Sequence, residues 1–400
     1  MKSLEKKLLV ANFLLYFFLA IFSYAYVDLN LTLSQNKFVL SFVNFLQALG
    51  YYHRSAATFI YLLFLITAFS FFLFNLWLFY KKQLSLSYLK FATLLSTFIL
   101  IFAYTFLSSD LFNYIFDAKI IIKYHANPYT HRPLDFPTDD WLRFMRWIHR
   151  YSPYGPLWLG YTLIPATLGF GKFIFNLITF KVFISIFHLI NALLIYRILN
   201  KIRPRATLFG TAFYALNPTL LLEGVANAHN DVVLATFLIL PIYLLTIRKT
   251  TLSYLTLFAG TLIKYIPILN LPWLIWYTFG RSKNVQFLIL LNLITMAIFT
   301  YFFSSFKISV PFVSSGATQV QFQPWYLFWT LPLVSLVSSP VLVLTSTTLA
   351  FGASLRYLPY LFYGDWSHSG TQLFMQSITF LPAVVVLIGV SIKTFRNKST

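Results

Sequence analysis

Cysteine is absent from this 400-residue chain, and acidic residues are scarce. Without cysteine the chain has neither a disulfide framework nor a thiolate metal site. Only 10 % of its residues are charged, against about a quarter in soluble domains, which excludes an ordinary soluble protein. No Gly/Ser-rich linker separates a second domain, and no glycine-rich nucleotide-binding loop is present.

Apolar and aromatic residues are abundant instead. Hydrophobic residues make up 58 % of the sequence and aromatic residues 20 %. Runs such as 8–27 and 56–80 are long enough to cross about 30 Å of hydrocarbon. We therefore predict an all-α, polytopic membrane protein, a helical bundle with about 12 transmembrane helices, roughly 10 to 13. The predicted spans are 8–27, 56–80, 91–109, 173–197, 206–222, 231–247, 251–265, 266–279, 285–303, 325–339, 341–360 and 372–392.

Basic residues indicate how the chain is oriented. The net charge is +20, but the positive residues are scattered over short loops, which favours topology signals and contacts with membrane lipids over nucleic-acid binding. With both termini in the cytoplasm, 17 of the 30 Lys and Arg lie inside, together with Glu5 alone among the acids. The other nine acids then lie outside. We expect a multi-pass protein of the cell membrane whose active site is on the outer face.

The longest outer loop, residues 110–172, contains two predicted amphipathic helices. One begins at Asp110 in DLFNYIFDAKIIIKY, and the other is DDWLRFMRWIHR (139–150). Residues 156–170 are too short to span comfortably, so we expect a re-entrant or interfacial helix there. The chain is interpreted as a single membrane-embedded domain. Its parts are an N-terminal hairpin (1–90), a core (91–330) and C-terminal helices (331–400).

Asp110 is the first candidate catalytic residue. It lies at the outer end of a predicted span, and Asp117 follows seven residues later, which puts both carboxylates on one helix face. The functional interpretation is a general base aimed at a sugar hydroxyl. The alternative is a helix cap, which the preceding Ser108 and Ser109 make credible.

A polar stretch, NPTLLLEGVANAHND (217–231), lies at the outer junction of two predicted spans. Ionisable residues near membrane depth are costly, so they tend to be functional or paired. The candidate substrate-binding residues here are Asn217, Glu223, His229 and Asp231. Capping of the next helix by Asn230 or Asp231 is the alternative. His229 and Asp231 also resemble half of a metal site, but two ligands make no site, and no metal ligand set is assigned.

Three cations lie within or beside apolar stretches. A buried Lys or Arg facing an outer cavity suits an anionic ligand such as a lipid phosphate, and Lys264 and Arg356 are the candidates. For Lys264 an internal salt bridge with Glu223 or Asp231 is an equal alternative. For Arg356 an internal salt bridge is likewise an equal alternative, and for Lys181, deep within a span, the internal salt bridge is preferred.

Aromatic residues accompany these groups on the predicted outer face. The candidates for substrate contact are Tyr114, Tyr129, Tyr154, Trp325 and Tyr326, with Asn127 beside them. They could stack on a sugar ring, whereas interfacial anchoring is the interpretation preferred for most of them.

The order of these pieces resembles the GT-C glycosyltransferases, and most closely the bacterial polyprenol-phosphate-mannose-dependent α-mannosyltransferases, including DUF2029-type proteins. The matching motifs are Asp110, Tyr114, NPY (127–129), SPYGPLW (152–158), ALNP (215–218), HND (229–231), GTLIKYIP (260–267) and QPWY (323–326). The series keeps its order over about half of the chain. Two predicted spans precede the span that ends just before Asp110, whereas in the simplest family members the acidic loop follows the first span.

The resemblance implies Asp110 as catalytic base, with Asp117 or Asp231 as a second acidic group, and Lys264 and Arg356 as ligands of the donor phosphate. The implied partners are a polyprenyl-phosphate-linked sugar, mannose by resemblance, and a glycolipid or glycan acceptor. Inversion at the sugar would give an α-linked product. No organic cofactor is implied, and a divalent-cation requirement stays open. The rival functions are a transporter or flippase of lipid-linked sugars, and a ligase or polymerase of lipid-linked glycans.

Overall fold

The computed structural model describes residues 1–31, 34–281, 283–302, 322–366 and 368–399. Within these ranges every regular element is helical and no strand occurs, which confirms the predicted all-α class. The α-helices are α1 (Ser3–Ser23), α2 (Lys37–Gln47), α3 (Arg54–Tyr80), α4 (Leu86–Ile101), α5 (Asp110–Tyr124), α6 (Pro156–Leu168), α7 (Phe173–Ile202), α8 (Thr207–Ala215), α9 (Pro218–Leu221), α10 (Asp231–Thr246), α11 (Thr250–Thr261), α12 (Leu271–Phe279), α13 (Val285–Ala297), α14 (Leu331–Val337), α15 (Pro340–Leu355), α16 (Leu358–Tyr363) and α17 (Thr371–Ser399).

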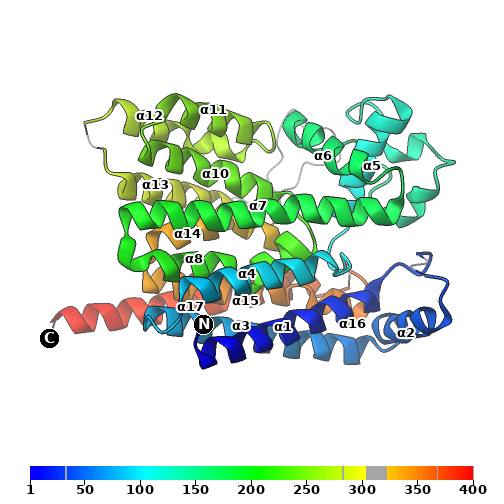
Figure 1. Cartoon of the computed structure of the whole chain (residues 1–400), viewed down its shortest axis with the longest axis horizontal. Helices are drawn as coiled ribbons and strands as arrows, with labels where there is room; N and C mark the ends of the chain where they lie inside the picture. The colour runs from blue at the N-terminus through cyan, green and yellow to red at the C-terminus, as the bar shows by residue number, and fades with distance from the viewer. Residues whose placement is uncertain (32–33, 282, 303–321, 367, 400) are drawn as a thin grey trace.

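Long apolar helices form the body of the protein and run along its long axis, with α2, α5 and α6 gathered at one end (Figure 1). Among the described residues, 5 helices are long and apolar enough to cross a membrane, or 6 if one bent pair is a single span. The number of about 12 is not confirmed, because several predicted spans form shorter helices. The long helices are Ser3–Tyr26, Arg54–Tyr80, Phe173–Ile202, Pro340–Tyr363 and Thr371–Val390, and the shorter apolar ones are Leu86–Ile101, Ile266–Phe279, Val285–Tyr301 and Pro324–Val337.

The bent pair interrupts the polar stretch 217–231. Asn217 caps α9, since its side chain accepts hydrogen bonds from the backbone N–H groups of Thr219 (3.0 Å) and Leu220 (3.4 Å). The helices Pro218–Ala226 and Asp231–Thr246 then meet at an angle of 117°. Residues 227–230 form the break, which brings their polar groups into the interior.

Helix α7 packs against the start of α10, the helix that follows this break. It packs against α6, α8 and α10. Buried Asn191 on α7 donates to the Val232 carbonyl (2.8 Å) and accepts a hydrogen bond from the Thr236 hydroxyl (2.7 Å). These bonds fix the first turns of α10, and therefore the position of the break.

The predicted span 91–109 ends early, because α4 stops at Ile101. Residues 102–109 are an irregular segment whose backbone groups are satisfied by side chains from elsewhere. The Tyr104 N–H donates to Ser23 Oγ (2.7 Å), and buried Lys181 donates to the Ala103 carbonyl. Lys181 is thus held by a backbone carbonyl, whereas the expected internal salt bridge is not found for it among the described residues. The segment leads to Asp110 at the start of α5.

The predicted helix over 139–150 is wrong. Only residues 140–144 are helical there, in a short 3-10 turn capped by the Asp139 side chain, which accepts from Trp141 N–H (2.9 Å). Trp141 and Phe144 nevertheless both contact Phe173 of α7. The Trp141 ring lies edge to face at a centroid distance of 5.4 Å, and the Phe144 ring stacks on Phe173 at 4.4 Å. These aromatic side chains hold the outer loop against α7, so the loop packs on the bundle without forming a long helix.

Candidate functional site

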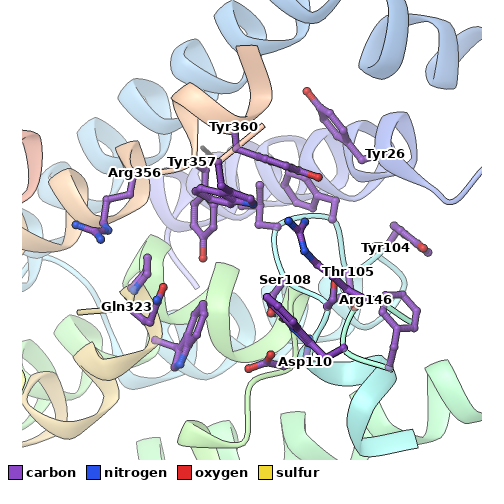
Figure 2. Close-up of a pocket in the computed structure, with 18 of the residues that line it drawn as sticks. Tyr26, Tyr104, Thr105, Ser108, Asp110, Arg146, Gln323, Arg356, Tyr357 and Tyr360 are labelled. Atoms are coloured by element: carbon purple, nitrogen blue, oxygen red, sulfur yellow. Dashed lines mark hydrogen bonds between the residues drawn. The ribbon is translucent and has the colours of Figure 1, made fainter. Parts of the chain in front are cut away.

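A pocket of about 520 Å³ opens beside Asp110, where the irregular segment, the outer loop and both terminal regions meet. Its polar walls include Asp110, Arg54, Arg146 and Arg356. In Figure 2, Asp110 lies at the lower edge of the view, Tyr357 and Tyr360 lie above it, and Arg356 lies to the left. The aromatic part of the lining consists of Tyr26, Tyr51, Tyr104, Trp147, Trp325, Tyr357, Tyr360 and Trp366, together with Phe106, Phe112 and Phe144.

Asp110 is the first residue of α5, and its side chain is 22 % exposed. Ser109 occupies the cap position without a side-chain cap bond, and the Asp110 N–H donates to Ser108 Oγ (3.2 Å). The Asp110 carboxylate itself lies 3.4 Å from His229 Nδ1. The helix-cap alternative therefore does not account for this carboxylate, which lines the pocket.

His229 lies between two carboxylates in the break before α10. Its Nδ1 is 3.4 Å from Asp110 Oδ2, and its Nε2 is 3.3 Å from Glu223 Oε2. Both His229 and Glu223 are fully buried, and the His229 ring stacks on Trp325 with centroids 4.0 Å apart. An imidazolium has two N–H donors, so in its charged form His229 offers one to each carboxylate. Ala228 beside it has a φ of 56°, a left-handed conformation that is strained for alanine.

Asp231 and Lys264 form a separate ion pair next to the break. Lys264 Nζ donates to Asp231 Oδ2 (2.6 Å), and the Trp329 indole donates to Oδ1 (2.7 Å). Asp231 is fully buried, so its charge needs these partners. The salt-bridge alternative for Lys264 is thus present in the structure, and Lys264 is not among the residues lining the pocket. With Asp231 so engaged, the half metal site gains no third ligand from the described residues.

Arg356 lies in the pocket wall, as a phosphate ligand would. Its guanidinium is held by three hydrogen bonds, donated to the Met375 carbonyl (3.0 Å), Thr379 Oγ1 (3.2 Å) and the Phe322 carbonyl (3.1 Å). Arg54 and Arg146 line the same pocket. Within the described part of the chain, none of these three arginines has a carboxylate within 4.0 Å.

The predicted aromatic contacts divide into three groups. Tyr114 is buried beneath the pocket, where its ring contacts Tyr154 and Trp158 edge to face, with centroid distances of 4.9 and 5.0 Å. Its hydroxyl accepts a hydrogen bond from Asn230 N–H (3.4 Å). Trp325 reaches the pocket, whereas Tyr326 stacks on Trp329 behind it (4.2 Å). Asn127 and Tyr129 line a separate shallow groove between α5 and α6. The structure therefore brings only part of the predicted set to the pocket.

Asp117 and Asp139 lie behind the pocket, where α5 meets the outer loop. Burial raises the pKa of Asp117 to about 7, although Ser152 beside it acts in the opposite direction. Burial would also raise the pKa of Asp139, but hydrogen bonds from Lys119 (2.7 Å) and Tyr124 (2.5 Å) outweigh it, so that pKa is lowered. Asp139 thus stays charged and ties the loop to α5.

The sequence analysis missed Arg54, Arg146 and the tyrosines of the pocket wall. Arg54 begins α3 two residues after Tyr52, and Arg146 follows Trp141 and Phe144 in the outer loop. Both arginines share a sequence feature that could have marked them as binding residues, namely a cation close to aromatic residues on the side predicted to be outside. They were not selected because the scattered basic residues were interpreted as topology signals and lipid contacts.

Comparison with known proteins gives one family match. The family model described as alpha-(1->6)-mannopyranosyltransferase, N-terminal domain, matches residues 19–280, which is more than half of the chain. No curated protein and no solved structure matches the chain significantly. The matched range contains Asp110, Glu223, His229 and Lys264, and ends before Arg356. The chain therefore belongs to the alpha-(1->6)-mannopyranosyltransferase family.

Proposed function

We propose that this protein transfers mannose from a polyprenyl-phosphate donor to the hydroxyl of a glycolipid or glycan acceptor at the outer face of the membrane. The observation that carries the proposal is that Asp110 lines one pocket together with three guanidinium groups. Among the described residues, no carboxylate lies within 4.0 Å of those groups, and this includes Asp28 in the same pocket wall. A transfer from a phosphate donor needs a proton acceptor for the attacking hydroxyl and a cation for the leaving phosphate. The family match supports mannose as the sugar and an α-(1->6) bond in the product.

In the proposed reaction, Asp110 accepts the proton of the acceptor hydroxyl while the oxygen attacks the anomeric carbon. The bond from that carbon to the phosphate oxygen breaks on the opposite face, so a β-linked donor gives an α-linked product. His229 is a positioning residue here, because its contact with the buried Glu223 fixes the ring that faces Asp110. Orientation of this kind supplies a large part of enzymatic rate, up to roughly 7–11 kcal/mol in favourable cases.

The leaving phosphate is assigned to Arg146, Arg54 and Arg356. Arg146 is exposed in the loop above Asp110, and Arg356 is buried and held rigidly by backbone carbonyls. A guanidinium binds two phosphate oxygens with parallel hydrogen bonds, which is stronger than a single contact. Lys264 is already paired with Asp231, so the proposal moves the phosphate role from Lys264 to these arginines. The aromatic walls then provide flat surfaces for the sugar and the first isoprene units.

Sugar transfer in proteoliposomes tests this function. The donor is radiolabelled polyprenyl-phosphate-mannose, the acceptors are a panel of mannose-terminated glycolipids, and GDP-mannose serves as the alternative donor. Asp110→Asn is expected to lower the turnover rate by about 10²- to 10⁴-fold, the range typical of a lost general base. The matched control is Asp140→Asn, which changes a carboxylate of the outer loop that is 86 % exposed and paired with Arg143.

Each outcome of that experiment decides something. Transfer that is lost in Asp110→Asn and kept in Asp140→Asn supports both the donor class and the base. Transfer that survives Asp110→Asn overturns the role of Asp110. Transfer from GDP-mannose but not from the lipid-linked donor overturns the donor class, and transport of the labelled lipid without sugar transfer favours the flippase alternative.

A further inference from the structure

A second, smaller cavity lies directly behind Asp110, on the side of α5 away from the large pocket. Its volume is about 70 Å³, and Asp110, Asn113 and Asp117 line it from α5 while Arg150 and Ser152 line it from the outer loop. Asp110 and Trp147 line both spaces, so they form the wall between them. Nothing in the reaction described above uses this cavity.

The cavity is lined by buried polar atoms that lack protein partners. Asp117 is only 4 % exposed, and its Oδ2 has no hydrogen-bond partner among the described residues. The same holds for Asn113 Oδ1 and for Ser152 Oγ. Unpartnered buried polar atoms are costly, and a polar cavity needs only about 10–15 Å³ of such space to hold one water molecule. The cavity therefore has both the room and the polar groups for several waters.

The spacing along α5 fits a short water chain. Asp110 and Asp117 are seven residues apart, which is about 10.5 Å of helix rise, on one face of the helix. The two carboxyls cannot share a proton directly at that distance, whereas waters held by Asn113 and Ser152 can connect them. Arg150 and Tyr151, which also line the cavity, are exposed, so the cavity borders on solvent.

We propose that this cavity is a water-filled proton exit, through which Asp110 passes the proton of the acceptor hydroxyl to Asp117 and then to the outer solution. The inference rests on the proposed function, because it concerns the proton that the glycosyl transfer releases. In each turnover the acceptor O–H bond breaks, the new carbon–oxygen bond forms, and the proton moves from Asp110 along the waters to the Asp117 carboxylate. Release of that proton to bulk water restores both carboxylates.

Two observations indicate why a second route is needed. The bound donor and acceptor occupy the large pocket, which is the open side of Asp110. In its charged form His229, which faces a carboxylate with each ring nitrogen, carries a hydrogen on both nitrogens and therefore cannot accept the proton. The cavity is thus the remaining direction in which the proton can leave.

The surroundings of Asp117 give its carboxyl a pKa at which it can accept and release a proton near neutral pH. Its burial raises its pKa to about 7. The titratable or charged groups that face it are Asp110 on its own helix and, from the outer loop, Tyr129, Arg150, Tyr151 and Tyr154. Among the described residues, Asp110 and Asp117 are the two carboxylates that line the cavity, so Asp117 is the group that takes up and returns the proton from Asp110 there.

Kinetics of Asp117 variants test the exit route. In the proteoliposome assay, Asp117→Asn is expected to lower kcat by about 10- to 100-fold with an unchanged KM, since the substrates bind on the other side of Asp110. Asp117→Glu keeps a carboxyl in the cavity and is expected to retain most of the rate. Asp117→Ala enlarges the cavity, so imidazole in the buffer should restore part of its rate. The control is Asp135→Asn, an exposed carboxylate paired with Arg132 in the same loop.

A measurement without turnover separates this inference from the proposed function. Infrared difference spectra of the detergent-solubilised protein should show a carboxyl band that titrates near pH 7, disappears in Asp117→Asn and shifts rapidly when H₂O is replaced by D₂O. A band that does not exchange in D₂O means a dry cavity and overturns the exit route, whatever the enzyme transfers. A kcat within twofold of the wild type in Asp117→Asn overturns it as well. Failure of the proposed function itself would show as absent transfer by the wild type, with the infrared result standing independently.

Discussion

His229→Gln is the substitution that most directly tests how the site is held together. The side chain of Gln is neutral and cannot face two carboxylates as an imidazolium does. The change therefore leaves Glu223, which is fully buried, without its cationic neighbour. The neighbours that remain include the Asn227 amide, which donates to the same carboxylate oxygen at 3.3 Å, and Tyr357.

The distances set the size of the effect. A unit charge pair at 3.3–3.4 Å is worth about 5 kcal/mol at an effective dielectric constant of about 20. Removing one partner of a buried pair costs about 3–5 kcal/mol in practice, because the other charge stays behind unpaired. At about 2 °C per kcal/mol for a large domain, the apparent melting temperature should fall by roughly 6–10 °C. Asp110 loses its orienting contact as well, so kcat should fall by about 100-fold.

Thermal unfolding in detergent and the transfer assay measure both effects. The double variant His229→Gln/Glu223→Gln supplies the decisive comparison, since it removes the unpaired buried charge and should recover much of the lost stability but none of the lost kcat. The reasoning is refuted if the single variant melts within 2 °C of the wild type, or if the double variant is no more stable than the single one. Either result would mean that His229 is neutral between its neighbours.

Three further predictions concern other parts of the site. Arg146→Ala should raise the KM for the donor and lower kcat/KM by about 10- to 100-fold, because a charge-assisted hydrogen bond to the phosphate is lost. Arg146→Lys keeps the charge and should recover part of the activity. An unchanged KM would show that Arg146 does not bind the phosphate. The pKa of Asp117 is raised to about 7 by burial, so the folded state holds this proton more tightly than the unfolded one, and stability should decline as pH rises from about 4 to 7. Asp117→Asn should flatten that decline, and an identical pH profile of melting temperature in both proteins would contradict it. Ala228→Gly relieves a left-handed alanine and should stabilise the fold by about 1 kcal/mol, whereas a lower melting temperature would show that the alanine methyl packs favourably enough to outweigh the strain.

Part of the candidate site could be predicted from the sequence because charge is rare in this chain. With ten acids in 400 residues, each acid near a span stands out, and Asp110, Glu223 and Asp231 were identified on that ground. Their pairing could not be predicted in the same way. Lys264 had two acids as equal alternatives, and the choice of Asp231 depends on the 117° bend that separates the two halves of the stretch.

Local patterns determined the helical class, the apolar spans and the family, because the hydrophobic period and the ordered motifs are properties of short segments. Tertiary structure decided where the helices stop and which residues share the pocket. The segment 102–109 is irregular because Ser23 and Lys181, far away in the chain, satisfy its backbone groups. Arg54 and Arg356 meet across one pocket although 302 positions separate their numbers. Such contacts depend on how the helices pack against one another, and no local pattern in the sequence contains that information.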